Sequence, residues 1–196
     1  MNLTRILSCI AAVAVFMVAP SASAKGRISF TEGETVSLSA FTGLAVKGGG
    51  IITVSPGSSH SVRVVEGGER VELFMDGGSL RVECARPCRG NVRRVLEVTT
   101  PAVSEVAIAG GGIITFEAGF AAQDELNTAI VGGGTLNALN LSAAEVNAAV
   151  TGGGSISVTA TRELNAAIIG GGSIVYAGNP PDVNPSVIGG GSISER

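Results

Sequence analysis

A glycine triplet that recurs about every twenty residues constrains this chain of 196 residues more than any other feature of its sequence. From Gly110 on, successive triplets begin 22, 20, 18 and 19 residues apart. Four units share, in order, an acidic residue, an aliphatic residue, an asparagine, an aliphatic residue, three glycines, a hydroxyl residue and an aliphatic residue; they begin at Glu125, Glu145, Glu163 and Asp182. A fixed period of this length predicts a repeat architecture.

Within each unit the side chains alternate with a period of two, as in a β-strand. Leu126, Thr128 and Ile130 are expected on one side, and Asn127 and Val131 on the other. Units this short bury too little surface to fold alone, but stacking places each aliphatic residue on its equivalent in the next coil. The sequence therefore predicts an all-β fold, a parallel β-helix (solenoid) with coils of about twenty residues.

The glycine triplets are predicted to form the corners of the coils, where the backbone needs a positive φ or where a neighbouring coil comes close. On this basis we expect Gly153 and Gly171 to resist substitution. The predicted corners are Gly48, Gly49 and Gly50; Gly110, Gly111 and Gly112; Gly132, Gly133 and Gly134; Gly152, Gly153 and Gly154; Gly170, Gly171 and Gly172; and Gly189, Gly190 and Gly191.

The composition fits a folded chain that lacks the usual material for metal or nucleic-acid chemistry. It is 45% hydrophobic with a net charge of −3, which argues against disorder, and its 29 glycines keep no Gly-X-Y period, which excludes collagen. Aromatic residues make up only 4%, so Val, Ile, Leu and Ala must build the core. With one His and three Cys, we expect no metal, no cofactor and no nucleic-acid partner.

Residues 1–24 have the features of a secretory signal peptide. Arg5 is the positive residue, Ile10–Val18 is a short apolar run, and Ala22-Ser23-Ala24 is a cleavage motif. We expect cleavage between Ala24 and Lys25, no transmembrane segment afterwards, and a single domain over residues 25–196. The mature chain is then periplasmic, on the cell surface or secreted.

Two cysteines of the mature chain are predicted to form a disulfide. Cys84 and Cys88 have three residues between them, and an even number of cysteines in an oxidising compartment is typical of disulfides. The alternative is a catalytic thiol, but the spacing is not the C-x-x-C of redox enzymes.

The region before Gly110 follows the pattern less strictly. Candidate strands are 51–54, 62–65, 71–75, 80–82 and 95–98, and the 62 residues between the triplets at Gly48 and Gly110 are close to three periods. Net charge is +2 over residues 25–98 and −6 over 99–196. This division of charge fits solvated loops. It also fits a contact surface, either head-to-tail between copies of the chain in a homo-oligomer or with the cell envelope.

Two polar columns follow from the repeat. Asn127, Asn147, Asn165 and Asn184 occupy equivalent positions, and stacked asparagines can hydrogen-bond amide to amide along a solenoid. Glu125, Glu145, Glu163 and Asp182 are also equivalent, either as exposed turn residues or as carboxylates at the spacing of a retaining glycosidase pair. If the acidic column binds no ligand, we expect Glu145→Gln with Glu163→Gln to leave the fold intact and to stabilise it slightly at low ionic strength.

Other catalytic and binding motifs are lacking in the sequence. No triplet has the G-x-G-x-x-G or P-loop pattern, G-x-S-x-G is not found, and no Asp stands two places after the glycines as in calcium-binding repeats. His60 lies in a turn composition and is expected to be an exposed loop residue rather than part of a triad.

The segments 41–46, 175–180 and 187–193, together with the repeated Gly-Gly-Gly-Ser-Ile, resemble the GIN domain, a family labelled as auto-transporter adhesin head domains. The resemblance covers about residues 28–193. It implies a right-handed parallel β-helix in an exported bacterial protein and supplies no catalytic residue.

These observations predict an exported, non-enzymatic interaction module that resembles an adhesin and binds a protein or glycan of the cell envelope. The alternatives are a carbohydrate-active β-helix enzyme and a structural factor in envelope stress or assembly.

Overall fold

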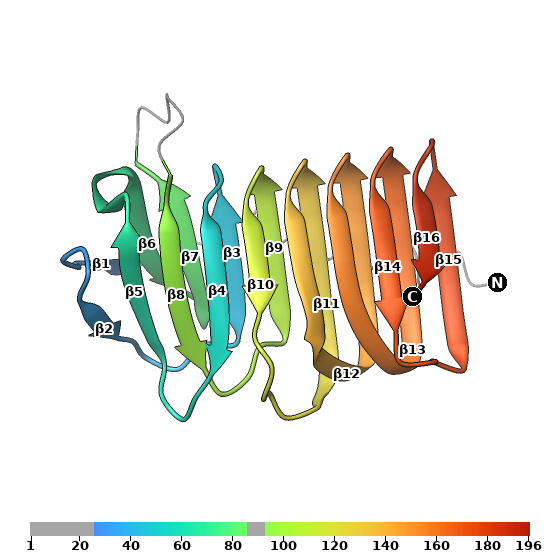
Figure 1. The fold of residues 1–196 in the computed structure, drawn as a ribbon, viewed down its shortest axis with the longest axis horizontal. Helices are drawn as coiled ribbons and strands as arrows, with labels where there is room; N and C mark the ends of the chain where they lie inside the picture. Colours follow the sequence, from blue (N-terminus) through green and yellow to red (C-terminus); the bar gives the residue numbers. More distant parts are fainter. Residues whose placement is uncertain (1–25, 86–92) are drawn as a thin grey trace.

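The structure, a computed structural model, describes residues 26–85 and 93–196, which form sixteen β-strands and one short 3-10 helix, η1 (Gly68–Arg70). All sixteen strands belong to one hydrogen-bonded sheet. The chain winds this sheet into a solenoid with two facing layers (Figure 1). The predicted all-β parallel solenoid is confirmed.

We call the layer whose strands lead into the glycine corners layer A, and the opposite layer, whose strands leave the corners, layer B. Layer A contains, in spatial order, β1 (Gly26–Ile28), β6 (Val71–Asp76), β7 (Ser79–Cys84), β3 (Gly43–Lys47), β9 (Glu105–Gly110), β11 (Gln123–Gly132), the second parts of β12 (Thr135–Gly152) and β13 (Ser155–Gly170), and β15 (Asp182–Ile188). Layer B contains β2 (Thr35–Ser37), β5 (Ser61–Glu66), β8 (Val95–Thr100), β4 (Ile51–Pro56), β10 (Ile113–Phe116), the first parts of β12 and β13, β14 (Ser173–Ala177) and β16 (Ser192–Glu195).

The repeated units stack in exact register along layer A. Leu126, Val146 and Leu164 are direct partners in successive parallel strands, and all three are fully buried between the layers. Each coil therefore places its aliphatic side chains on those of the next coil, as the period of two predicts. The buried core consists almost wholly of Val, Ile, Leu and Ala, with Phe41 and Phe116 as its large aromatic residues.

The order of the first coils in space differs from their order in the chain. β3 pairs in parallel with β9, and β4 pairs with β10, so the corners at Gly48 and Gly110 belong to adjacent coils. The 62 residues between these triplets are not three stacked periods. After β4 the chain crosses to the other side of the β3–β4 coil, where β7 and β8 form a further parallel coil. All five strands expected in this region are present, as β4 to β8.

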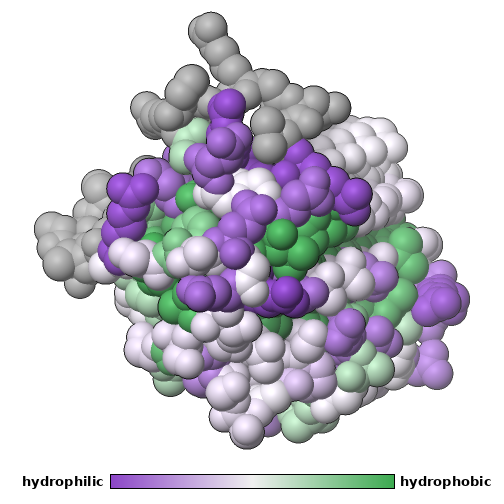
Figure 2. Space-filling view, turned by 60° about the vertical axis from the view of Figure 1, so that its left-hand side comes forward, coloured by the Kyte–Doolittle hydropathy of each residue, from purple (hydrophilic) through white to green (hydrophobic). Residues whose placement is uncertain are grey.

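The N-terminal end of the solenoid is closed by antiparallel strands. β5 pairs with β8 and β6 with β7, both antiparallel, and the three-residue strands β1 and β2 add to β6 and β5. Figure 2 brings this end forward and shows hydrophilic side chains gathered in patches on it. Very short edge strands are one way in which proteins protect a sheet edge from pairing.

The corners assign different roles to the three glycines of a triplet. Gly170 has φ +121°, and a Cβ atom there would lie 2.6 Å from the carbonyl oxygen of Gly152. A Cβ atom at Gly172 would lie 2.6 Å from the oxygen of Gly154. The middle glycines, Gly153 and Gly171, have open space and no left-handed φ. The expectation that these two resist substitution is therefore wrong, since the constraint falls on their neighbours.

Two predictions from the sequence lie outside the described residues. The signal peptide over 1–24 is one of them. The disulfide is the other: Cys84 is the buried last residue of β7, but Cys88 is not among the described residues, so the pairing stays a prediction. Over the described ranges, no helix has the length and apolar character needed to cross a membrane.

Candidate functional site

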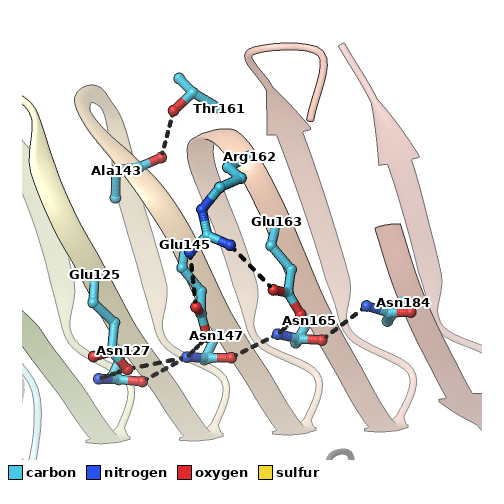
Figure 3. Close-up of polar contacts among 10 residues, drawn as sticks. All are labelled: Glu125, Asn127, Ala143, Glu145, Asn147, Thr161, Arg162, Glu163, Asn165 and Asn184. Carbon is cyan, nitrogen blue, oxygen red and sulfur yellow. Dashed lines mark hydrogen bonds and ion pairs between the residues drawn. The ribbon is translucent and has the colours of Figure 1, made fainter. Parts of the chain in front are cut away.

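The four equivalent asparagines form a ladder of side-chain amides on the outer surface of layer A (Figure 3). The Nδ2 of Asn147 donates to the Oδ1 of Asn127 at 3.0 Å, Asn165 donates to Asn147 at 3.0 Å, and Asn184 donates to Asn165 at 3.1 Å. Each asparagine from Asn147 on thus donates a hydrogen bond to the side-chain oxygen of the asparagine in the preceding coil. Because these amide donors are used within the chain, the ladder contributes to the stability and order of layer A.

The acidic column runs beside the ladder and is engaged with it. Oε1 of Glu125 accepts from Asn127 at 3.0 Å and from Asn147 at 3.3 Å, and Oε1 of Glu163 accepts from Asn165 at 3.1 Å. Arg162 lies between two carboxylates, 3.2 Å from Glu145 and 3.7 Å from Glu163 (Figure 3). Arg162 therefore offsets the repulsion between these carboxylates, on which the expected stabilisation by Glu145→Gln with Glu163→Gln depends, and both replacements would remove ion pairs with Arg162.

A second outward column lies at the edge of layer A next to the corners. It consists of Val131, Thr151, Ile169 and Ile188, which are in register on consecutive strands, and we call it the corner column. Val131 and Ile169 are each 38% exposed and Ile188 is 64% exposed. Between this column and the ladder lies a row of small side chains that point outward yet are almost fully covered by their neighbours: Ala107, Ala129, Ala149 and Ala167.

Several of the described basic residues of the first half are paired with acidic residues. Arg27 pairs with Glu72 at 3.1 Å, and Arg81 pairs with Asp76 at 3.1 Å. Arg63 pairs with Glu97 at 3.3 Å. These contacts neutralise much of the positive charge within the N-terminal end itself, which favours the interpretation of the charge division as local surface pairing.

The expectation that His60 is an exposed loop residue is wrong. Its ring is partly buried and packs edge-on against Phe41, with ring centroids 5.0 Å apart. Nδ1 lies 3.2 Å from Oγ1 of Thr100 and accepts from the backbone N–H of Phe41 at 3.4 Å. The residue fixes the turn before β5. In residues 26–85 and 93–196, no group of three or more His, Cys, Asp and Glu side chains is placed to hold a metal ion.

Glu105 extends the asparagine column onto β9, where it is the direct partner of Asn127. Burial raises the pKa of its carboxyl above the ordinary value of 4.5. Between the ordinary and the raised pKa, the folded chain holds more protons than the unfolded chain, so this group makes stability fall as the pH rises through that window.

We expect Glu105→Gln to remove this loss. The variant should gain free energy of unfolding relative to wild type at pH 7 and gain less at pH 4, where the wild-type carboxyl is largely protonated in the folded state. Urea titrations of both proteins at the two pH values measure the difference. A gain that does not depend on pH, or a loss at pH 7, would contradict the role assigned to the partly buried carboxyl of Glu105.

Sequence reasoning missed two features of this surface. Arg162 was not expected to bridge the acidic column, although it is the one basic residue between residues 99 and 195 and directly precedes Glu163. The corner column was not singled out, although the alternation within each unit already placed Val131 on the outer side with Asn127.

Comparison with known proteins agrees with this architecture. Residues 121–180 match the model of the family described as "Putative auto-transporter adhesin, head GIN domain". A crystal structure described as a putative adhesin from Bacteroides fragilis superposes with a TM-score of 0.52 at 17% identity, covering 89% of this chain and 98% of that one. This likeness shows the shared fold.

Two further crystal structures are more distant. A putative adhesin from Parabacteroides merdae has a TM-score of 0.39 at 16% identity and covers 89% of this chain and 97% of that one. A putative cell adhesion protein from Clostridium sporogenes has a TM-score of 0.37 at 12% identity and covers 88% and 100%. Among curated proteins, no sequence matches this chain. The coils from residue 121 to residue 180, which carry most of the ladder and most of the corner column, thus have the GIN-domain pattern of the adhesin head family.

Proposed function

We propose that this chain is an exported, non-enzymatic module that binds a protein of the cell envelope through the corner column. The observation that supports this proposal is the exposure of large aliphatic side chains in register: Val131, Ile169 and Ile188 lie on the outside of layer A and add nothing to the core. Clustered apolar surface of this kind is typical of protein contacts.

The chemistry of the surface favours a protein over a glycan as the partner. Sugar-binding surfaces use aromatic side chains and polar groups that are free to bind hydroxyls. The corner column and the alanine row contain no aromatic residue, and the neighbouring asparagine amides donate to one another. The aliphatic side chains of Val131, Ile169 and Ile188, with Thr151 between the first two, lie in one row on strands about 4.8 Å apart and instead fit an apolar protein surface.

The contacts of the acidic column support a non-enzymatic function. Glu145 and Glu163 of the acidic column are the carboxylates that could act as a glycosidase pair. Both form ion pairs with Arg162 and accept hydrogen bonds from amides of the asparagine ladder. These carboxylates are used to order the surface of layer A. Release of reducing ends from envelope polysaccharide by the purified chain would overturn this part of the proposal.

The test compares two double variants of the purified mature chain for binding to envelopes isolated from the same cells. Val131→Lys with Ile169→Lys places two charges in the corner column, and we expect binding to fall at least about tenfold because a buried ammonium is costly in an apolar contact. The matched control, Thr115→Lys with Ser157→Lys, places two charges at outward positions of layer B and should bind as wild type does.

The nature of the partner is tested on the envelopes. Protease treatment should abolish binding of the wild-type chain, whereas periodate oxidation of glycans should leave it unchanged. Loss of binding with periodate alone would identify a glycan and overturn the protein partner. Wild-type binding by the corner-column variant, with an unchanged melting temperature, would overturn the assigned surface.

A further inference from the structure

The two ends of the solenoid are finished in different ways. Among the described strands, β15 pairs only with β13 and β16 only with β14, so both layers end in a strand with one free edge (Figure 1). The core is also open there. Val187 points inward like its partner Ile168, but it is 41% exposed, whereas Ile168 is fully buried. In the part of the chain that the structure describes, this end carries no antiparallel strands of the kind found at the other end.

The direction of the backbone groups on this edge follows from the register. The N–H of Asn127 donates back to the carbonyl of Ser104 in the preceding coil. Asn184 is equivalent to Asn127 through Asn147 and Asn165. Since N–H groups alternate along a strand, those of the neighbouring inward residues point forward. On β15 the residues whose backbone nitrogen atoms face the free edge are therefore Val183, Pro185 and Val187.

Proline stands at the centre of this free edge. Its partner in the preceding coil is Ala166, and the coil before that has Ala148, so the repeat has alanine here in both inner coils. Proline has no N–H, and its ring occupies the space where a pairing strand would place its acceptor. It is compatible with an edge strand when its nitrogen faces away from the ladder, as it does here.

We propose that Pro185 keeps the C-terminal end of the solenoid from pairing with a second copy of the same chain. Two identical ends related by a two-fold axis would pair antiparallel, β15 with β15 and β16 with β16, and would join their two open cores. The backbone groups on the free edge of one copy can therefore pair with those of a second copy, except at residue 185. The proline removes a donor in each copy from the middle of the joint sheet, and it places a ring against the partner strand.

The experiment gives the last coil the residue of the inner coils. Pro185→Ala is expected to self-associate at least about tenfold more tightly than wild type in sedimentation velocity, because each copy regains a backbone donor and loses a steric block. The wild-type chain, purified after export, should sediment as a monomer over the same concentrations. Both proteins should melt at similar temperatures, since Pro185 is exposed and its backbone nitrogen faces away from β13.

Two controls locate the effect. Pro181→Ala changes an exposed proline that precedes β15 and should leave the protein monomeric. Pro185→Ala combined with Val187→Lys places a charge in the open core and should restore the monomer. The proposal is overturned if Pro185→Ala sediments as wild type does, if Pro181→Ala associates equally, or if the Lys variant still associates.

Discussion

Replacing Gly170 or Gly172 by alanine is expected to lower the free energy of unfolding by about 2–4 kcal/mol. At Gly170 the backbone has φ +121°, a conformation that residues with a side chain rarely adopt, and the new Cβ would lie 2.6 Å from the oxygen of Gly152. At Gly172 the new Cβ would lie 2.6 Å from the oxygen of Gly154 and 2.6 Å from Cγ1 of Val150. The backbone of the preceding coil cannot move aside without breaking the ladder of hydrogen bonds.

The matched control is Gly171→Ala, one residue away from both. This glycine is exposed, has no left-handed φ, and a Cβ there would meet nothing within 4 Å. Alanine at this position should leave stability unchanged or raise it by up to about 1 kcal/mol, because it restricts the unfolded chain. Thermal and urea unfolding of the three variants measure the pattern. Equal destabilisation by all three would contradict the assignment of the constraint to the first and third glycines.

Replacing Asn165 by aspartate is expected to cost about 2–3 kcal/mol. Asn165 is 8% exposed, and its Nδ2 donates to Asn147 at 3.0 Å and to Glu163 at 3.1 Å. An aspartate has no N–H at this position. The substitution removes both hydrogen bonds and places a carboxylate in a nearly buried site that faces two oxygen atoms.

Asn137→Asp is the matched control for the ladder. Asn137 is exposed on layer B, and its Oδ1 accepts from the backbone N–H of Leu139 at 3.4 Å, a contact that aspartate can keep. We expect a change within about 0.5 kcal/mol for this variant. Urea titration of both variants at neutral pH gives the comparison. If Asn165→Asp were as stable as Asn137→Asp, the ladder would be an incidental alignment of surface amides.

The repeat made the solenoid predictable because its signal is local. Each unit carries its own alternation and its own glycines, so equivalent residues such as Leu126 and Val146 could be paired without knowledge of distant contacts. The asparagine positions could be aligned in the same way. The repeat does not predict the order in which the irregular coils before Gly110 stack.

The features that sequence reasoning missed depend on contacts between coils. Gly48 and Gly110 lie in adjacent coils because β7 and β8 stack on the opposite side of the β3–β4 coil, and no local pattern encodes that crossing. The freedom of Gly171 was missed because the three glycines look alike in the sequence, whereas only Gly170 and Gly172 face backbone atoms of the preceding coil. Arg162 was missed because its place beside Glu145 depends on the stacking of two coils.

The proposed function depends on export, because an adhesin-like module must reach the envelope or the outside of the cell. N-terminal sequencing of the native chain recovered from separated cytoplasmic, periplasmic, envelope and external fractions tests this directly. We predict a chain that begins at Lys25 and is found outside the cytoplasm. Recovery of the chain from the cytoplasm with Met1 or Asn2 at its start would contradict the proposed function.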